Sequence, residues 1–423
     1  MSLIRRGNPR QGSTQRRPTS HAQFMRRRLG VFGAAAVVLA VGLYLPLTLL
    51  APLQATAASL APITNSQGPA AAVTLPAYGA SAIGAIGYPG VLGTGGSTKP
   101  MPIASISKIV TSLVVLKTKP IAAGTSGPTI TFTAADAALT AKYIALNGET
   151  KPLYAGSRIS QLDLMRVMLV ASANNYADAL AQWAFGSHAA FESAVAGWLT
   201  ANGLDHTTIL EPTGINPGNV STAADLVSLG KLALANPVVS AIVSTRSFSL
   251  SGVGSFDNTN TLLGHDGVDG IKTGTLNGES NLLFAANYTY GHHTITVVGA
   301  VIGGSDHNSV DGAVKALLAG VKAGFHEITL VKKGQSFASF TTPWGDRVQA
   351  VSTKTVSVLV WSSAPVTSVV NTLPVGVSQR GSVVGQVTFS VGSQTVTVPL
   401  ALDHAIGDPG FWWRLGHPAD LLK

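Results

Sequence analysis

Residues 104–117 read ASISKIVTSLVVLK, and this stretch decides how the rest of the chain is interpreted. Its apolar residues recur at helical spacing and predict a helix that starts near Ser105: Ile106, Ile109, Val110, Leu113, Val114 and Leu116. Ser105 and Lys108 are three residues apart, so they lie on one face of that helix. A serine hydroxyl beside a lysine amine at a helix start is a candidate nucleophile and base.

Further helices and strands follow this one. Residues 162–186 (LDLMRVMLVASANNYADALAQWAFG) predict a helix to Val170, a short break and a second helix to Gly186. Helices are also expected over 223–235 and 307–325, and Val/Ile/Thr-rich strands over 267–273, 281–286 and 294–303. Helices interleaved with a late antiparallel sheet predict an α/β or α+β domain over residues 75–325.

The pattern changes after Phe325. Alternating runs at 355–361, 382–391 and 394–402, separated by Gly, Ser and Pro, predict a small all-β domain over 328–402. The tail, residues 403–423, carries Phe411, Trp412 and Trp413. Two interpretations stay open for these aromatic residues: packing onto the β domain, or contact with a membrane surface, where Trp is favoured.

The N-terminal segment predicts the cellular location of the protein. Residues 1–28 hold eight arginines and no Lys, Asp or Glu, and residues 29–51 (LGVFGAAAVVLAVGLYLPLTLLA) are 23 uncharged residues. That run is long enough to cross a bilayer as a helix, so we expect a single-pass anchor, with cleavage after Ala57 as the alternative. Both place the arginine tail in the cytoplasm and residues 52–423 outside it. Residues 52–74 are expected to be a linker.

Composition excludes several classes of protein. The formal charge of +9 comes from the arginine tail, because residues 29–423 hold 20 basic and 19 acidic residues. A basic nucleic-acid-binding face is therefore not expected. The chain has no cysteine, which excludes disulfides, thiolate metal sites and a cysteine nucleophile. The ten histidines show no spacing typical of zinc sites, so no metal or cofactor is expected.

Three short motifs carry the chemistry. They are Ser105-Ile106-Ser107-Lys108, Ser172-Ala173-Asn174 in the predicted helix break, and Lys272-Thr273-Gly274 on a predicted strand. Lys108 can act as a base only if its amine is neutral, and burial or the positive charge of Lys272 would favour that state. Backbone N–H groups at a helix start can stabilise an oxyanion.

These motifs, in this order, resemble the penicillin-binding proteins and serine β-lactamases. The flanking segments PIASISKIVTSL, LMRVMLVASANNYADALA, EPTGIN with STAADL, and GIKTGTLNGESNLLFAA are similar to the low-molecular-weight D-alanyl-D-alanine carboxypeptidases over residues 75–325. The β domain is similar to the accessory domain of that family. The resemblance implies a penicillin-sensitive enzyme that removes D-Ala from peptidoglycan stem peptides ending in D-Ala-D-Ala. Many relatives have a C-terminal amphipathic helix; we expect none after residue 402.

The resemblance also implies a role for each motif residue. Ser105 would be the acylated nucleophile, Lys108 the general base, and Ser172 a proton relay. Asn174 would bind the substrate amide, Lys272 and Thr273 the terminal carboxylate, and the N–H groups of Ser105 and Thr275 the oxyanion. Gly274 would leave room for the substrate backbone.

Two other functions stay open. A class A β-lactamase needs a glutamate in an E-x-x-L-N loop, whereas Glu211 to Asn216 is one residue longer, so we expect Glu211 to support the loop. A cell-wall-binding protein with a relic site is the non-enzymatic alternative, and three intact motifs argue against it.

Overall fold

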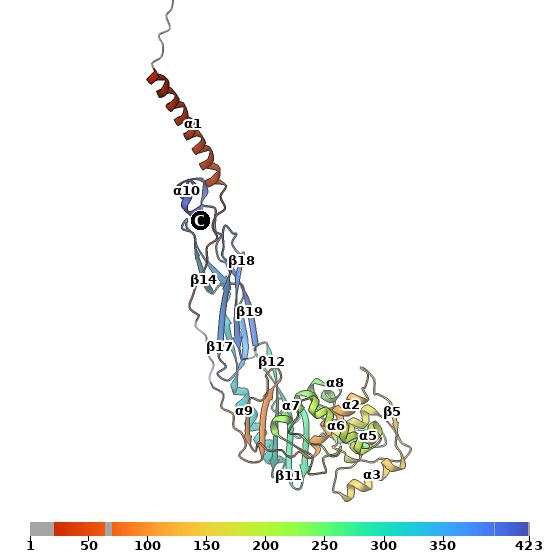
Figure 1. The fold of residues 1–423 in the computed structure, drawn as a ribbon. Helices are drawn as coiled ribbons and strands as arrows, with labels where there is room; N and C mark the ends of the chain where they lie inside the picture. Colours follow the sequence, from red (N-terminus) through yellow and green to blue (C-terminus); the bar gives the residue numbers. More distant parts are fainter. Residues whose placement is uncertain (1–20, 64–69, 393, 422–423) are drawn as a thin grey trace, which may run out of the picture.

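A computed structural model describes residues 21–63, 70–392 and 394–421. It shows three parts in a line: the apolar helix α1 (His21–Leu49), a β-rich part, and at the far end a part of mixed helix and sheet (Figure 1). The predicted fold class is thereby confirmed. Residues 1–20 of the predicted basic tail lie outside the described residues.

The mixed part is built on a five-stranded antiparallel sheet in the order β10-β11-β12-β2-β3. Its strands are β2 (Ala80–Ala85), β3 (Gly93–Gly96), β10 (Val268–Leu276), β11 (Glu279–Tyr290) and β12 (His293–Gly304). Side chains on a strand alternate between the two faces. Leu282 and Phe284 accordingly pack with Val314 of α9 (His307–Gly324), while Leu283 and Ala285 join a separate core on the opposite face.

Helices cover that opposite face. α7 (Ala223–Ala235) contacts β2 and β12, and Gly230 permits its close approach, since a Cβ there would lie 2.5 Å from Val298 Cγ1. Behind α7 lies α2 (Ser107–Thr118), buried from Ser107 to Leu116 and in contact with α4 (Gln161–Val170), α5 (Asn174–Phe185) and α6 (His188–Ala201). Because α2 is surrounded by other elements, its apolar residues extend beyond a single face.

Smaller elements complete this part. They are β4 (Met101–Pro102), β5 (Thr129–Thr131), α3 (Ala134–Ala145), β6 (Arg158–Ser160), β7 (Val220–Ser221), α8 (Pro237–Val243), β8 (Ser247–Leu250) and β9 (Gly254–Asp257). The expected helix start at Ser105 differs from the structure. A 3₁₀ turn, η1 (Ala104–Ile106), precedes α2, and Ala104 at its start has a left-handed backbone, with φ +50°.

The β-rich part has a six-stranded sheet in the order β1-β14-β15-β19-β18-β17 and a separate pair, β13-β16. Its strands are β13 (Phe325–Val331), β14 (Ser336–Thr341), β15 (Arg347–Ser352), β16 (Val356–Trp361), β17 (Val366–Thr372), β18 (Val383–Val391) and β19 (Gln394–Leu402). Phe337, Phe340 and Phe389 of the sheet share one core with Ile328 and Val358 of the pair.

Two segments differ from the expectations. Within the predicted linker, β1 (Ser59–Leu60) pairs with β14, and Thr56 forms a bridge with Val375, so this segment runs along the β-rich part. After residue 402 the structure has two short helices, α10 (Gly410–Gly416) and α11 (Pro418–Leu421). The sequence analysis expected no amphipathic helix of the kind found in relatives, and it did not identify these two, because helices of seven and four residues are too short to show a periodic pattern.

Candidate active site

Ser105 lies in the η1 turn, directly before α2. The Lys108 side-chain nitrogen lies 2.8 Å from Ser105 Oγ, so the expected pairing of these two residues is present despite the 3₁₀ start. Ala104 holds a left-handed backbone that non-glycine residues rarely adopt. Such strain is typical of functional sites, where surrounding packing holds the backbone in place.

Lys108 is completely buried. Besides Ser105, its nitrogen bonds Asn174 Oδ1 and the Thr213 carbonyl oxygen, each at 2.6 Å. Burial and the positive charge of Lys272 lower the pKa of Lys108 well below its ordinary value. The amine therefore spends far more time in the neutral form than an exposed lysine does, which is the state a base requires.

Ser172 lies in the break between α4 and α5, with a left-handed backbone at φ +58°. Lys272, on β10, donates to Ser172 Oγ at 3.0 Å and to the Thr273 carbonyl at 3.2 Å. Lys272 is buried, and burial lowers its pKa to about 7. The structure thus joins the second and third motifs through one hydrogen bond.

Gly274 brings β10 against the nucleophile turn. A Cβ at this position would lie 2.6 Å from the Ile103 carbonyl oxygen and 3.4 Å from the Ser105 nitrogen. The expected reason for glycine was room for substrate, whereas the structure shows that it also makes room for the protein's own backbone. Asn281 of the neighbouring strand secures the same turn by donating to the Pro102 carbonyl at 3.1 Å.

A cavity of about 240 Å³ collects the motif residues. Six predicted residues line it: Ser105, Ser172, Asn174, Thr273, Gly274 and Thr275. Lys108 and Lys272 are buried and do not line the cavity, but their side-chain nitrogens bond Ser105 and Ser172, which do. A larger, mostly apolar cavity near Tyr88 and Trp361 contains no motif residue.

Sequence reasoning missed several residues of the cavity wall. Asn147, Gly148 and Glu149 follow α3, and Asn147 is another left-handed residue, with φ +55°. Thr259 Oγ1 lies 2.5 Å from Thr273 Oγ1, and His307 Nε2 lies 2.8 Å from Thr275 Oγ1. No motif marks a lone threonine or histidine, so only the fold reveals them.

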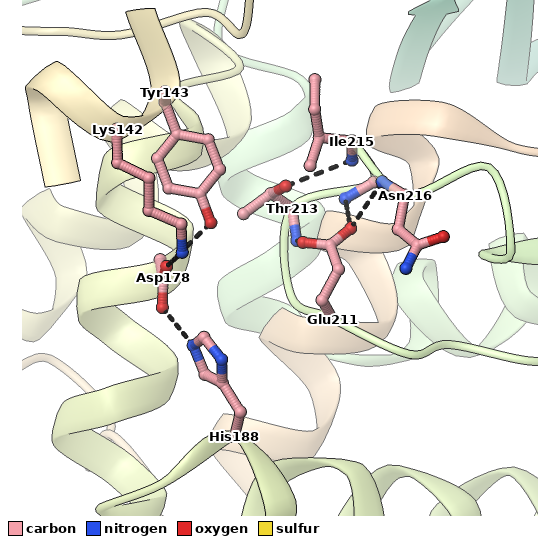
Figure 2. Close-up of polar contacts among 9 residues, drawn as sticks. Lys142, Tyr143, Asp178, His188, Glu211, Thr213, Ile215 and Asn216 are labelled. Carbon is pink, nitrogen blue, oxygen red and sulfur yellow. Dashed lines mark hydrogen bonds and ion pairs between the residues drawn. The ribbon is translucent and has the colours of Figure 1, made fainter. Parts of the chain in front are cut away.

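Glu211 supports a loop, as expected. Its carboxylate accepts the N–H groups of Thr213 at 2.7 Å and Gly214 at 2.6 Å (Figure 2). Glu211 is not among the residues that line the cavity. The loop matters to the site because the Thr213 carbonyl accepts from Lys108. Gly214 has φ +87°, and a Cβ there would overlap the Ala104 carbonyl.

Asp178 is also structural. This buried carboxylate accepts from Lys142 at 2.8 Å and Tyr143 at 2.7 Å and lies 2.6 Å from His188 Nε2, tying α3 and α6 to α5 (Figure 2). Burial alone would raise the pKa of Asp178, but the hydrogen bonds from Lys142, His188 and Tyr143 hold it below its usual value. Within the part of the chain that the structure describes, no cluster of three or more His, Asp and Glu is arranged to hold a metal ion.

The fold and the Ser–Lys pair define a serine enzyme of the penicillin-binding class. Solved structures of similar fold include penicillin-binding protein 3 of Streptococcus pneumoniae (19% identity, 79% of this chain and 100% of that one, TM-score 0.57). Penicillin-binding protein 5 of Haemophilus influenzae is 20% identical over 82% of this chain and 100% of that one, with a TM-score of 0.55. These likenesses establish the fold.

The sequence comparisons establish the family. Residues 89–302 match the D-alanyl-D-alanine carboxypeptidase family, and the chain belongs to it. The chain is similar to the D-alanyl-D-alanine carboxypeptidase DacC of Escherichia coli, with 28% identity over 77% of this chain and 83% of that protein. It is also similar to a D-alanyl-D-alanine endopeptidase of Escherichia coli, with 31% identity over 43% of this chain and 58% of that one. The predicted activity, a serine-type carboxypeptidase, is confirmed.

Proposed function

We propose that this carboxypeptidase removes the terminal D-Ala from peptidoglycan stem peptides through an acyl-enzyme on Ser105. One observation carries the assignment: the buried Lys108 nitrogen lies 2.8 Å from Ser105 Oγ. Neutral Lys108 takes the Ser105 proton as the oxygen attacks the carbonyl of the penultimate D-Ala. The N–H groups of Ser105 and Thr275 stabilise the resulting oxyanion.

Collapse of that intermediate releases the terminal D-Ala. Its amine nitrogen must gain a proton as the amide bond breaks. Ser172 is suited to deliver it, because its hydroxyl lies on the cavity wall and accepts from Lys272 at 3.0 Å. Asn174 links this region to the base, since its Oδ1 accepts from Lys108 at 2.6 Å. Water then hydrolyses the Ser105 ester.

Thr273, with Lys272 behind it, forms the seat for the terminal carboxylate. A lysine and a hydroxyl together give charge-assisted hydrogen bonds to a carboxylate. The test compares D-Ala release from a D-Ala-D-Ala peptide and from its C-terminal amide. The amide should lower kcat/KM on the order of 10²-fold, and the two substrates should become nearly equal in Lys272→Ala. Equal rates in the unmodified enzyme would remove the seat.

β-Lactams are proposed as inhibitors, because their amide occupies the place of the scissile bond. The rival β-lactamase function is not supported: the Glu211 carboxylate is bound by loop N–H groups and does not face the cavity. A non-catalytic function is not supported either, since a relic site has no need of two buried lysines, which are costly to keep.

α1 is proposed as an uncleaved membrane anchor. Its residues Ala22–Leu49 have a mean hydropathy of 2.1 over the best 18-residue window, and none of that window is buried. The arginines of residues 1–28, of which Arg26, Arg27 and Arg28 lie in the N-terminal turns of α1, would remain in the cytoplasm, and residues 52–423 would lie outside. Intact mass of the protein from membranes tests this proposal. A chain that begins after Ala57 would show a cleaved signal instead.

A further inference from the structure

We propose that Tyr143 and Asp178 are positioning residues for the base. Their hydrogen bond fixes the end of α3, and the end of α3 in turn orients the Asn174 side chain on Lys108. This rests on the proposed role of Lys108 as the base for Ser105. A continuous path of contacts leads from the Asp178 carboxylate to the Lys108 nitrogen.

The Asp178 carboxylate fixes the last turn of α3. Its side chain has no exposed surface, and it accepts from Tyr143 Oη at 2.7 Å and from Lys142 Nζ at 2.8 Å (Figure 2). Tyr143 is itself only 2% exposed, so its hydroxyl requires this acceptor. His188, at the start of α6, lies 2.6 Å from the other carboxylate oxygen. The place of α3 on α5 therefore depends on one buried carboxylate.

The end of α3 sets the place of Gly148. The Gly148 N–H donates to the Tyr143 carbonyl at 2.8 Å, and between them Asn147 has a left-handed backbone, with φ +55°. This turn leads the chain from α3 into the cavity wall, which Asn147, Gly148 and Glu149 line. A displacement of Tyr143 therefore displaces Gly148 as well.

Gly148 and Glu149 hold Asn174 by both its main chain and its side chain. The Glu149 carbonyl accepts the Asn174 N–H at 2.7 Å. A Cβ at position 148 would lie 2.4 Å from Asn174 Nδ2, so the amide nitrogen packs directly on the glycine. Because Gly148 closes off the nitrogen side of the amide, the oxygen side faces Lys108, whose nitrogen lies 2.6 Å away. The loop after α3 thus sets the contact of Asn174 with the base.

This contact matters because a neutral amine has only two N–H bonds and one lone pair. The Lys108 nitrogen lies within hydrogen-bond distance of three oxygens, those of the Asn174 amide, the Thr213 carbonyl and the Ser105 hydroxyl. When the first two accept its two hydrogens, the lone pair is left for the Ser105 proton. Without the Asn174 oxygen, one N–H is free to turn toward Ser105, and the lone pair is no longer directed at the proton it must accept.

The test compares penicillin acylation of the full chain in Tyr143→Phe and Tyr88→Phe. Tyr143→Phe keeps the buried ring and leaves Asp178 its two other partners, so the protein should fold. The acylation rate constant at saturating penicillin should fall about tenfold, since a misplacement of about 1 Å can cost on the order of 10²-fold. The half-saturating penicillin concentration should stay the same. Tyr88→Phe should change neither value, because the Tyr88 hydroxyl also donates to a carbonyl, that of Leu359 at 2.9 Å, but lies outside the wall of the motif cavity.

A double-mutant cycle tests the path of contacts. If Tyr143 acts through Asn174, its effect should disappear where the Asn174 side chain is already absent. Tyr143→Phe should therefore slow acylation about tenfold in the unmodified chain and less than about twofold in Asn174→Ala.

A second variant disturbs the same contact from the loop. Gly148→Ala presses a Cβ against the Asn174 amide, so it should slow acylation by a factor similar to that of Tyr143→Phe. Gly197→Ala on α6, where a Cβ meets nothing within 4 Å, should leave acylation unchanged.

Three results would overturn the positioning role of Tyr143. One is an unchanged rate constant in folded Tyr143→Phe. Another is a loss that persists in full in Asn174→Ala, which would place the effect at Thr213, beside which Tyr143 also lies (Figure 2). The third is a change in the half-saturating concentration alone. All three leave the proposed function intact, whereas an unmodified enzyme that forms no penicillin adduct on Ser105 would remove that function itself.

Discussion

The side-chain nitrogen of Lys272 lies 3.0 Å from the Ser172 hydroxyl oxygen, although 100 residues separate them in the sequence. This contact places one buried lysine beside the serine of the helix break, while the other buried lysine, Lys108, contacts Ser105. Each serine of the cavity therefore has its own lysine. We expect the protonation state of Lys272 to affect that of Lys108, because the positive charge of Lys272 lowers the pKa of Lys108.

The first prediction concerns the pH dependence of acylation. Burial and the charge of Lys272 lower the pKa of Lys108, so the rate of penicillin acylation should rise with pH as Lys108 loses its proton. In Lys272→Met the positive charge beside Lys108 is lost, so the pKa of Lys108 should rise. The rising, acidic part of the curve of acylation rate against pH (its acidic limb) should therefore move to higher pH. Stopped-flow acylation from about pH 5 to about pH 10 measures this limb.

Lys231→Met provides the control for that experiment. Lys231 is a partly buried lysine of α7 that donates to the Tyr88 and Gly90 carbonyls, away from the cavity. Its loss should leave the acidic limb in place. An unmoved limb in Lys272→Met would show that Lys272 does not control the base.

The second prediction concerns the close packing at Gly274. In Gly274→Ala the new Cβ would lie 2.6 Å from the Ile103 carbonyl, so β10 or the Ser105 turn must shift. Misplacing an oxyanion N–H group should lower kcat/KM by roughly 10²- to 10³-fold. Gly312→Ala on α9, where a Cβ meets nothing within 4 Å, should leave kcat/KM unchanged. Normal activity in Gly274→Ala would refute the proposed placement of the oxyanion site.

The third prediction separates support from catalysis at Glu211. Glu211→Gln weakens the hydrogen bonds that hold the Thr213 loop, so it should lower stability by about 1–3 kcal/mol and slow acylation through Lys108. The decay of the penicillin acyl-enzyme should be slow in the unmodified protein and unchanged in the variant. Rapid decay that Glu211→Gln abolishes would instead assign Glu211 to the deacylating water.

Much of the fold could be predicted from the sequence because local patterns were strong. The helix over 223–235 has the predicted bounds, and the break at Ser172 lies between two helices as expected. The 3₁₀ turn at Ser105 could not be predicted, because it begins at Ala104, a non-glycine residue with a left-handed backbone that no sequence pattern marks. The α10 helix was not predicted from the sequence for a different reason: it is too short to show a helical pattern.

In the site, too, features that are local in the sequence could be predicted, whereas features that depend on tertiary contacts could not. The motif residues were found because each motif is contiguous in the sequence, and the structure brings them around one cavity. Thr259 and His307 come from a loop and a helix start that only the folded sheet brings near Thr273 and Thr275. The close contact of Gly274 with Ile103 likewise joins segments far apart in the chain.

The central claim is that Ser105 is the acylated nucleophile. The most direct measurement is the intact mass of the protein incubated with penicillin, followed by peptide mapping of the adduct. We predict one added penicillin on the peptide containing Ser105, no adduct in Ser105→Ala, and a normal adduct in Ser97→Ala, a control in an exposed loop. An adduct that persists in folded Ser105→Ala, or that maps to another serine, would contradict the account.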